Sequence, residues 1–235
     1  MQQSVVVARR GAAFPARLAS LFMPPECVGC GHQGAVLCRR CRFGILATSA
    51  VEVPDRSHRE PVYAAAPFAG TVRDIVTGLK YRNRRDAARV LARLIAERID
   101  LGPVDLVTWA PTTDRRARRR GFDQAELLAR ELARLVGVPS RRLLFRRHGP
   151  AQTGRSRAER MALDADSAFR GHSRRQGLRV VVVDDVVTTG STLHAARESL
   201  WAAGVADVVC VAAAATPSSP RPTGVGLTLP ARRHR

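Results

Sequence analysis

Four consecutive valines, Val180 to Val183, constrain the fold of this chain more than any other feature. β-Branched residues favour strands, and a strand without polar alternation belongs in a sheet that is buried on both faces. Thr192 to Ala203 then has helical spacing and stops at Gly204, and Val208 to Ala214 forms a second apolar strand. This order of strand, helix and strand predicts an α/β fold with a parallel sheet flanked by helices.

Two adjacent carboxylates, Asp184 and Asp185, follow the valines directly, at the end of the strand where α/β sheets bind ligands. A loop with four hydroxyl side chains around one glycine comes next and opens into the helix: Thr188, Thr189, Gly190, Ser191 and Thr192. Hydroxyls, free amides and a helix N-terminus can hold a phosphate, while paired carboxylates accept hydrogen bonds from a vicinal diol or coordinate Mg²⁺. The stretch therefore predicts a site for a sugar 5-phosphate. An ordinary Ser/Thr cap on the helix is the alternative.

The basic charge of the chain favours a polyanionic ligand. The 235 residues include 39 Lys and Arg against 20 Asp and Glu, a formal net charge of +19. Such an excess suits phosphorylated small molecules, nucleic acid or an anionic surface. Residues 115–175 concentrate it, with 17 arginines and 6 acidic residues. Lys80 is the only lysine, which makes it a candidate for a position that requires a compact point charge.

Four of the five cysteines form two pairs, Cys27-x-x-Cys30 and Cys38-x-x-Cys41. Each CxxC pair can wrap a tight turn, and two such turns complete a tetrahedral zinc site. A zinc with four cysteine ligands is closed, so it would hold a small module together and would not catalyse. Two redox-active pairs or disulfides are the alternatives. Cys210 lies within the last apolar strand and is expected to be a buried core thiol.

Composition divides the chain into five segments. We predict an N-terminal segment with a short helix (1–22), a zinc ribbon (23–50), a linker (51–61), an α/β domain (62–216) and a disordered basic tail (217–235). The longest apolar run, Val208 to Ala215, is far shorter than the roughly 20 residues of a membrane span. Arg9 and Arg10 end the apolar run of Val5 to Val7, which is too short for the apolar core of a signal peptide. We therefore expect a cytoplasmic protein.

The stretch from Val180 to Thr192 resembles the phosphoribosyl-pyrophosphate (PRPP) signature of type I phosphoribosyltransferases. The wider chain resembles the ComF family, which joins an N-terminal zinc ribbon to such a domain. The shared features are the paired CxxC, Leu79-Lys80-Tyr81, Pro111, the segment from Arg120 to Arg130, Gln152, Arg160, Phe169 and the Asp-Asp loop. The chain departs from the family pattern at Asp123, where Asn is usual, and at Arg155, where an apolar residue is common. Thr188 speaks against hypoxanthine or guanine salvage, because the transferases for those bases carry an Asp base there.

The resemblance implies a type I phosphoribosyltransferase-like fold and a role for each part of the site. Asp184 and Asp185 would bind the ribose hydroxyls in the catalytic site, and Thr188 to Thr192 would bind the 5-phosphate. The loop 110–113 would bind pyrophosphate, with Lys80, Arg115 and Arg120 as the cations. Mg²⁺ would accompany PRPP, and a structural Zn²⁺ would bind the four cysteines. The alternative for most of the arginines is a solvated basic face.

Two functions remain open on the sequence. In the first, an enzyme transfers a phosphoribosyl group from PRPP to an unidentified acceptor. In the second, a non-catalytic fold of this type binds nucleic acid or a helicase-like partner, because ComF proteins are linked to DNA uptake in natural competence. The basic segment and tail would suit single-stranded DNA. Aromatic residues make up only 5% of the chain, so such binding would be mainly electrostatic.

Overall fold

The computed structural model describes residues 24–54, 60–146, 169–171, 177–216, 221–222 and 227–228. Its main sheet has six strands in the order β4, β7, β8, β2, β1, β9. In that order they are Leu106–Trp109, Arg179–Val187, Asp207–Ala215, Val62–Ala64, Val51–Val53 and Arg221–Pro222. The first four are parallel, and β1 pairs antiparallel with both β2 and β9. The predicted α/β fold with a parallel sheet is confirmed, with an added antiparallel edge.

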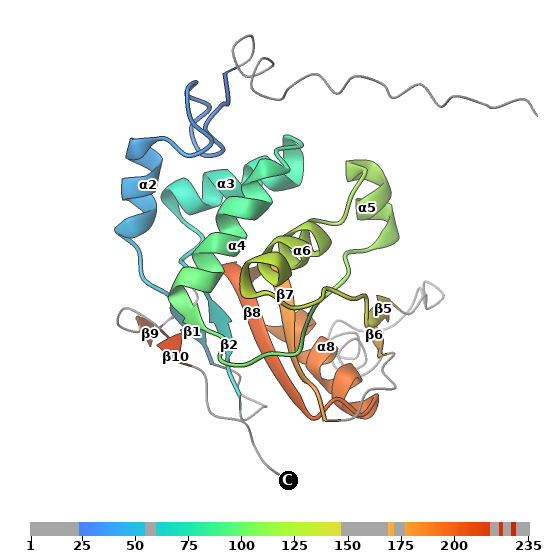
Figure 1. Cartoon of the computed structure of the whole chain (residues 1–235). Helices are drawn as coiled ribbons and strands as arrows, with labels where there is room; N and C mark the ends of the chain where they lie inside the picture. The colour runs from blue at the N-terminus through green and yellow to red at the C-terminus, as the bar shows by residue number, and fades with distance from the viewer. Residues whose placement is uncertain are drawn as a thin grey trace, which may run out of the picture.

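Helices cover both faces of the sheet (Figure 1). They are α3 (Gly70–Tyr81), α4 (Asp86–Arg98), α6 (Gln124–Val136) and α8 (Ser191–Ala202). Val181 and Val183 share one apolar cluster with α3, α4 and α6, whereas Val180 and Val182 share the other with α8. All four valines have no exposed surface. The unbroken valine run therefore supplies apolar side chains to both helical layers, which is why it shows no alternation.

Short strands lie within two of the predicted segments, the linker and the tail. Strand β1 lies inside the stretch 51–61 that was predicted to be a linker, and Val51 is buried. Within the predicted tail, β9 pairs with β1, and β10 (Leu227–Thr228) pairs with β3 (Ile99–Asp100). Strands of two or three residues satisfy backbone groups at an edge without any hydrophobic period, so composition alone does not reveal them. The predicted N-terminal helix lies outside the described residues.

The cysteine-rich segment packs on α3 beside a helix that was not predicted, α2 (Arg39–Leu46). Arg84, which follows α3, donates to the Cys27 carbonyl at 3.0 Å and pairs with the Glu26 carboxylate. Arg98 at the end of α4 donates to the Ile45 carbonyl at 2.6 Å and to the Ala65 carbonyl at 3.0 Å. These contacts join the cysteine-rich segment to the α/β core.

Three further elements complete the described part of the chain. α5 (Asp114–Arg120) is a seven-residue helix in which no residue is buried. β5 (Leu144–Arg146) and β6 (Phe169–Gly171) form a small antiparallel pair outside the main sheet. Among the residues that the structure describes, no helix is long and apolar enough to cross a membrane.

Candidate functional site

A cavity of about 930 Å³ opens beside the carboxyl ends of β4 and β7. Six cationic side chains line it: Lys80, Arg115, Arg116, Arg119, Arg120 and Arg146. Three carboxylates line it as well: Asp123, Asp184 and Asp185. The excess of cations over carboxylates makes the cavity suited to a polyanion. The fold thus brings together the two predicted carboxylates and all three predicted pyrophosphate-binding cations, Lys80, Arg115 and Arg120.

The sole lysine lies against the acidic pair. Lys80 comes from the last turn of α3, and its Nζ is 2.8 Å from Oδ1 of the buried Asp185. The Asp185 backbone N–H donates to Asp184 Oδ1 at 2.7 Å. Burial, followed by the charge of Asp185, raises the pKa of the Asp184 carboxyl to about 8, although Lys80 lowers it. A carboxyl that is neutral near pH 7 can donate a hydrogen bond as well as accept one.

The hydroxyl loop lies between β7 and α8. Gly190 adopts the left-handed conformation at φ 82°, and a Cβ there would lie 2.6 Å from Nε2 of His194. The Thr189 hydroxyl donates to Ser191 Oγ at 3.1 Å and accepts from the Ser191 N–H at 3.4 Å. Thr192 lines the cavity, whereas Thr188, Thr189 and Ser191 have exposed side chains. Their role as a phosphate cradle stays a prediction.

The arginines reach the cavity from two directions. Arg120, at the end of α5, donates from Nη1 to Gln124 Oε1 at 2.6 Å, and its guanidinium lies 5.0 Å from the centroid of the Tyr81 ring. Arg146 comes from β5 and donates from Nε to the Pro111 carbonyl at 2.8 Å. Burial lowers the pKa of its guanidinium. Our sequence reasoning missed Arg146, and no local signal could have found it, because the tertiary fold alone brings β5 beside the loop 110–113.

Arg116 and Arg119 were also missed, although a signal for them existed. Both lie on α5, within a turn of the predicted Arg115 and Arg120. Residues three or four apart share one face of a helix. A predicted helix over this segment would therefore have placed Arg116 beside Arg120 and Arg119 beside Arg115.

Asp123 is a further cavity residue that the sequence did not identify as functional. Its Oδ1 accepts from the backbone N–H groups of Ala125 at 3.0 Å and Glu126 at 3.4 Å, so Asp123 caps the N-terminus of α6. Its Oδ2 accepts from the Thr112 N–H at 2.9 Å. Burial raises the pKa of this carboxyl even though the three N–H groups lower it. One side chain thus joins α6 to the loop that follows β4.

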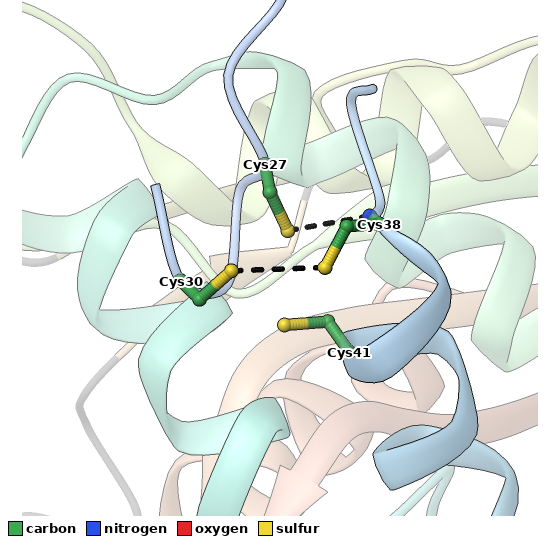
Figure 2. Close-up of side chains that lie close together, drawn as sticks. All are labelled: Cys27, Cys30, Cys38 and Cys41. Carbon is green, nitrogen blue, oxygen red and sulfur yellow. Dashed lines mark hydrogen bonds between the residues drawn. The ribbon is translucent and has the colours of Figure 1, made fainter. Parts of the chain in front are cut away.

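The four clustered cysteines form a candidate metal centre away from the cavity. The Sγ atoms of Cys27, Cys30, Cys38 and Cys41 all lie within 4.8 Å of one another, and all four thiols are free (Figure 2). The Sγ atoms of Cys30 and Cys38 are 3.7 Å apart. A tetrahedral zinc with Zn–S bonds of about 2.3 Å requires sulfur atoms about 3.8 Å apart. The donor set and its spacing therefore fit a metal such as zinc.

Backbone hydrogen bonds prepare one of these thiols for a metal. Burial raises the pKa of the Cys27 thiol, but N–H groups of Cys38, Cys30 and Gly29 outweigh it and lower the pKa to about 6. The Cys38 N–H lies 3.4 Å from Cys27 Sγ. Because the thiolate is the form that binds a metal, this arrangement favours binding. Cys210, outside the cluster, is buried as predicted, and its thiol lies 3.4 Å from the Leu193 carbonyl.

Comparison with known proteins agrees with the fold. The family model of the phosphoribosyl transferase domain matches residues 118–224. The chain is 34% identical to DNA utilization protein YhgH of Salmonella typhi over 142 residues, which cover 57% of this chain and 63% of that protein. It is 31% identical to competence protein F of Haemophilus influenzae over 145 residues, covering 57% and 63%. The chain is thus similar to proteins of the ComF family and to the phosphoribosyl transferase domain.

A third relative matches a shorter stretch of the chain. Competence protein ComFC of Bacillus subtilis is 34% identical over 96 residues, which cover 41% of this chain and 38% of that protein. The chain spans less than two thirds of the length of each of these three relatives. Of the family features noted in the sequence, Lys80, Tyr81, Pro111, Arg120 and residues 123–125 line the cavity. Gln152 and Arg160 lie outside the described residues.

Proposed function

We propose that this protein binds PRPP, or another ribose 5-phosphate, in the cavity at the ends of β4 and β7 and transfers its phosphoribosyl group to an acceptor. The observation that carries the proposal is the contact of Lys80 with Asp185 in a cavity lined by five arginines. Carboxylates suit the ribose hydroxyls, and cations suit the phosphates. The two kinds of group lie together here, as a phosphorylated sugar requires.

The proposed roles follow the geometry. Asp184 and Asp185 bind the 2- and 3-hydroxyls of the ribose, and Thr188 to Thr192 bind the 5-phosphate at the start of α8. Lys80, Arg115 and Arg120 bind the pyrophosphate together with the loop 110–113. Mg²⁺ accompanies the pyrophosphate as part of the substrate and neutralises part of its charge.

The reaction needs little covalent help from the protein. The C1–oxygen bond to pyrophosphate breaks, and the nucleophile of the acceptor forms a bond to C1 and loses its proton to solvent. The transition state resembles an oxocarbenium ion, so correct placement of the ribose and electrostatic stabilisation of the departing pyrophosphate supply most of the acceleration. Arg120 is held by Gln124 and Tyr81, which reduces the entropy that it loses on binding an anion.

Calorimetric titration with PRPP and Mg²⁺ tests the proposal. The wild type should bind, and the double variant Asp184→Ala/Asp185→Ala should show no heat of binding while it remains folded by circular dichroism. Arg93→Ala is the matched control, because Arg93 is an exposed arginine of α4 that does not line the cavity. A folded wild type that does not bind PRPP, or a double variant that binds it equally well, would reject the site.

Turnover should depend on the same acidic pair. With a panel of nucleobase-like acceptors, pyrophosphate release from PRPP should be lost in Asp185→Asn, with little change in stability. The amide keeps the size of the carboxylate but not the charge that Lys80 and the ribose hydroxyls require. Unchanged release of pyrophosphate would show that the pair takes no part in the reaction.

A second candidate function is the binding of nucleic acid, which the surface of α5 favours. Five of the seven residues of this helix are arginines, and Arg115, Arg116, Arg118 and Arg119 are exposed. The names of the relatives, DNA utilization protein and competence protein, point the same way. We propose single-stranded DNA as the ligand in this case, with a helicase-like protein as a partner in DNA uptake. Contact would be mainly with phosphates.

Salt dependence tests this second function. The affinity for a fluorescent oligonucleotide should fall steeply with salt concentration, and neutralising Arg118 and Arg119 to Gln should reduce the slope of log K against log salt by about 1 to 2. Arg93→Gln should leave the slope unchanged. Affinity that does not depend on salt would reject an electrostatic mode of binding.

We also propose that the cysteine cluster binds one structural Zn²⁺ per chain. The four thiols and their spacing support this, and a reducing compartment would keep them available for the metal. A cytoplasmic location is therefore part of the proposal. Elemental analysis of the purified protein should give one zinc per chain. A folded protein without metal would reject this assignment.

A further inference from the structure

The loop 110–113 has few backbone donors to offer an anion. Pro111 has no N–H, and the Ala110 N–H donates to the Val183 carbonyl at 3.1 Å within the sheet. The Pro111 carbonyl accepts from Arg146. Thr112 and Thr113 supply the remaining N–H groups of the loop, and both residues line the cavity beside the arginines.

Asp123 already holds one of these two donors. The Thr112 N–H donates to Asp123 Oδ2 at 2.9 Å. The other oxygen, Oδ1, accepts from the first N–H groups of α6, those of Ala125 and Glu126. A carboxylate is planar, so fixing Oδ1 at the helix end also fixes Oδ2 at the Thr112 amide. A negatively charged oxygen of the protein therefore lies where an oxygen of a bound anion would accept the same hydrogen bond.

We propose that Asp123 is the residue that limits how tightly the cavity binds pyrophosphate, because its carboxylate occupies the Thr112 amide. The inference rests on the proposed function, since it takes the loop 110–113 as the pyrophosphate subsite. To accept from Thr112, a pyrophosphate oxygen must displace Asp123 Oδ2 and must approach a like charge, and both cost affinity. Weaker retention of pyrophosphate also favours its release after transfer.

Two arginines of the cavity bind residues next to Asp123 and Thr112. Arg120 holds Gln124, the residue after Asp123, and Arg146 holds the carbonyl of Pro111, the residue before Thr112. Asp123 therefore partly neutralises the cavity wall at the point where the loop meets α6. It acts as a specificity-determining residue through its charge and its hydrogen bond, and no step of the reaction passes through it.

Asp123→Asn separates these effects from folding. Asn is as good as Asp at a helix N-cap, so its single amide oxygen can keep the bonds to Ala125 and Glu126. The amide NH₂ cannot accept a hydrogen bond, so the Thr112 N–H becomes available, and one negative charge is removed. Asp114→Asn is the matched control. Asp114 lies in the first turn of α5, where the change removes the same charge near the same arginines but leaves the Thr112 amide occupied.

The experiment is calorimetric titration of the wild type and the two variants with Mg²⁺-pyrophosphate, PRPP and ribose 5-phosphate. Thermal denaturation should give similar midpoints for all three proteins. Asp123→Asn should bind pyrophosphate and PRPP about tenfold more tightly and ribose 5-phosphate within twofold of the wild type. Asp114→Asn should change each affinity by no more than about twofold.

The outcomes distinguish this inference from the proposed function. If the wild type binds PRPP and ribose 5-phosphate but Asp123→Asn gains nothing for pyrophosphate, the role of Asp123 is rejected and the proposed function stands. If Asp114→Asn gives the same gain, the effect is one of charge alone, and occupation of the amide is rejected. If Asp123→Asn gains for pyrophosphate but no protein binds ribose 5-phosphate or PRPP, the proposed function fails and Asp123 still controls an anion site.

Discussion

Asp184 is the residue at which the architecture of the site has its clearest energetic consequence. Strand β7 delivers it next to Asp185 in a partly buried position, so its negative charge loses hydration and faces a second carboxylate. The hydrogen bond from the Asp185 N–H and the charge of Lys80, which pairs with Asp185 at 2.8 Å, offset part of this. The folded protein therefore favours the neutral form of Asp184 up to about pH 8. A diol or a cation that binds beside Asp184 would relieve this unfavourable ionisation.

The stability of Asp184→Asn should therefore depend on pH. The pKa of Asp184 rises from 3.8 to about 8 on folding. Below pH 3.8 the carboxyl is neutral in both the folded and the unfolded protein, and as the pH rises from 3.8 to 8 its ionisation in the unfolded protein lowers the free energy of unfolding. Asn cannot ionise, so the variant should become more stable than the wild type as the pH increases, by at least about 1 kcal/mol at pH 8. Urea denaturation at pH 5, 6.5 and 8 measures the difference. A difference that does not change with pH would contradict the raised pKa.

At the scale of elements, the turn from β7 into α8 decides how the hydroxyl loop is presented. Two features require glycine at position 190. One is its φ of 82°, and the other is the approach of His194, whose Nε2 would lie 2.6 Å from a Cβ. Gly137 at the end of α6 has a similar φ of 76°, but nothing lies within 4 Å of its missing Cβ. Substitutions at the two glycines therefore distinguish the cost of backbone strain from the cost of steric conflict.

Gly137→Ala and Gly190→Ala should differ accordingly. Gly137→Ala should lower the free energy of unfolding by about 1 kcal/mol, the cost of a left-handed alanine. Gly190→Ala should cost more, because His194 must move, and it should also weaken ribose 5-phosphate binding. Denaturant unfolding and calorimetry on both variants measure these effects. Equal costs with unchanged binding would show that the turn at Gly190 does not shape the site.

At the scale of the whole molecule, the cysteine cluster and the cavity share a helix. α3 packs beside α2, and the Val28 carbonyl would lie 3.4 Å from a Cβ at Gly78. The same helix ends in Lys80 and Tyr81 at the cavity. Arg84 adds a hydrogen bond from the end of α3 to the Cys27 carbonyl. The position of Lys80 therefore depends on how the cysteine-rich segment sits against α3.

Loss of the metal should consequently destabilise more than the cysteine-rich segment. Cys38→Ser should abolish zinc binding and lower the melting temperature by more than about 5 °C, because metal binding contributes to folding. Cys210→Ala is the control, since it removes a buried thiol outside the cluster and should keep one zinc per chain. Elemental analysis and calorimetric melting measure both quantities. A metal-free Cys38→Ser protein with an unchanged melting temperature would contradict the coupling.

The sequence by itself determined the features that depend on near neighbours in the chain. The valine run, the helix after it and the second apolar strand specify a βαβ unit because hydrophobic periodicity is local. The CxxC pairs specify four converging thiols because each pair lies in one turn. The acidic pair and the hydroxyl loop are adjacent in the chain, so their place at the end of β7 also followed from the pattern.

Only the tertiary structure decided which distant groups join them. Lys80 reaches Asp185 from α3, and Arg146 reaches the loop 110–113 from β5. The second oxygen of Asp123 accepts from the Thr112 N–H because the fold brings the loop 110–113 beside the start of α6. The short strands β1, β9 and β10 likewise depend on backbone pairing between remote segments. Such contacts leave no periodic trace in a sequence, because they form only when packing of the helices on the sheet brings the segments together.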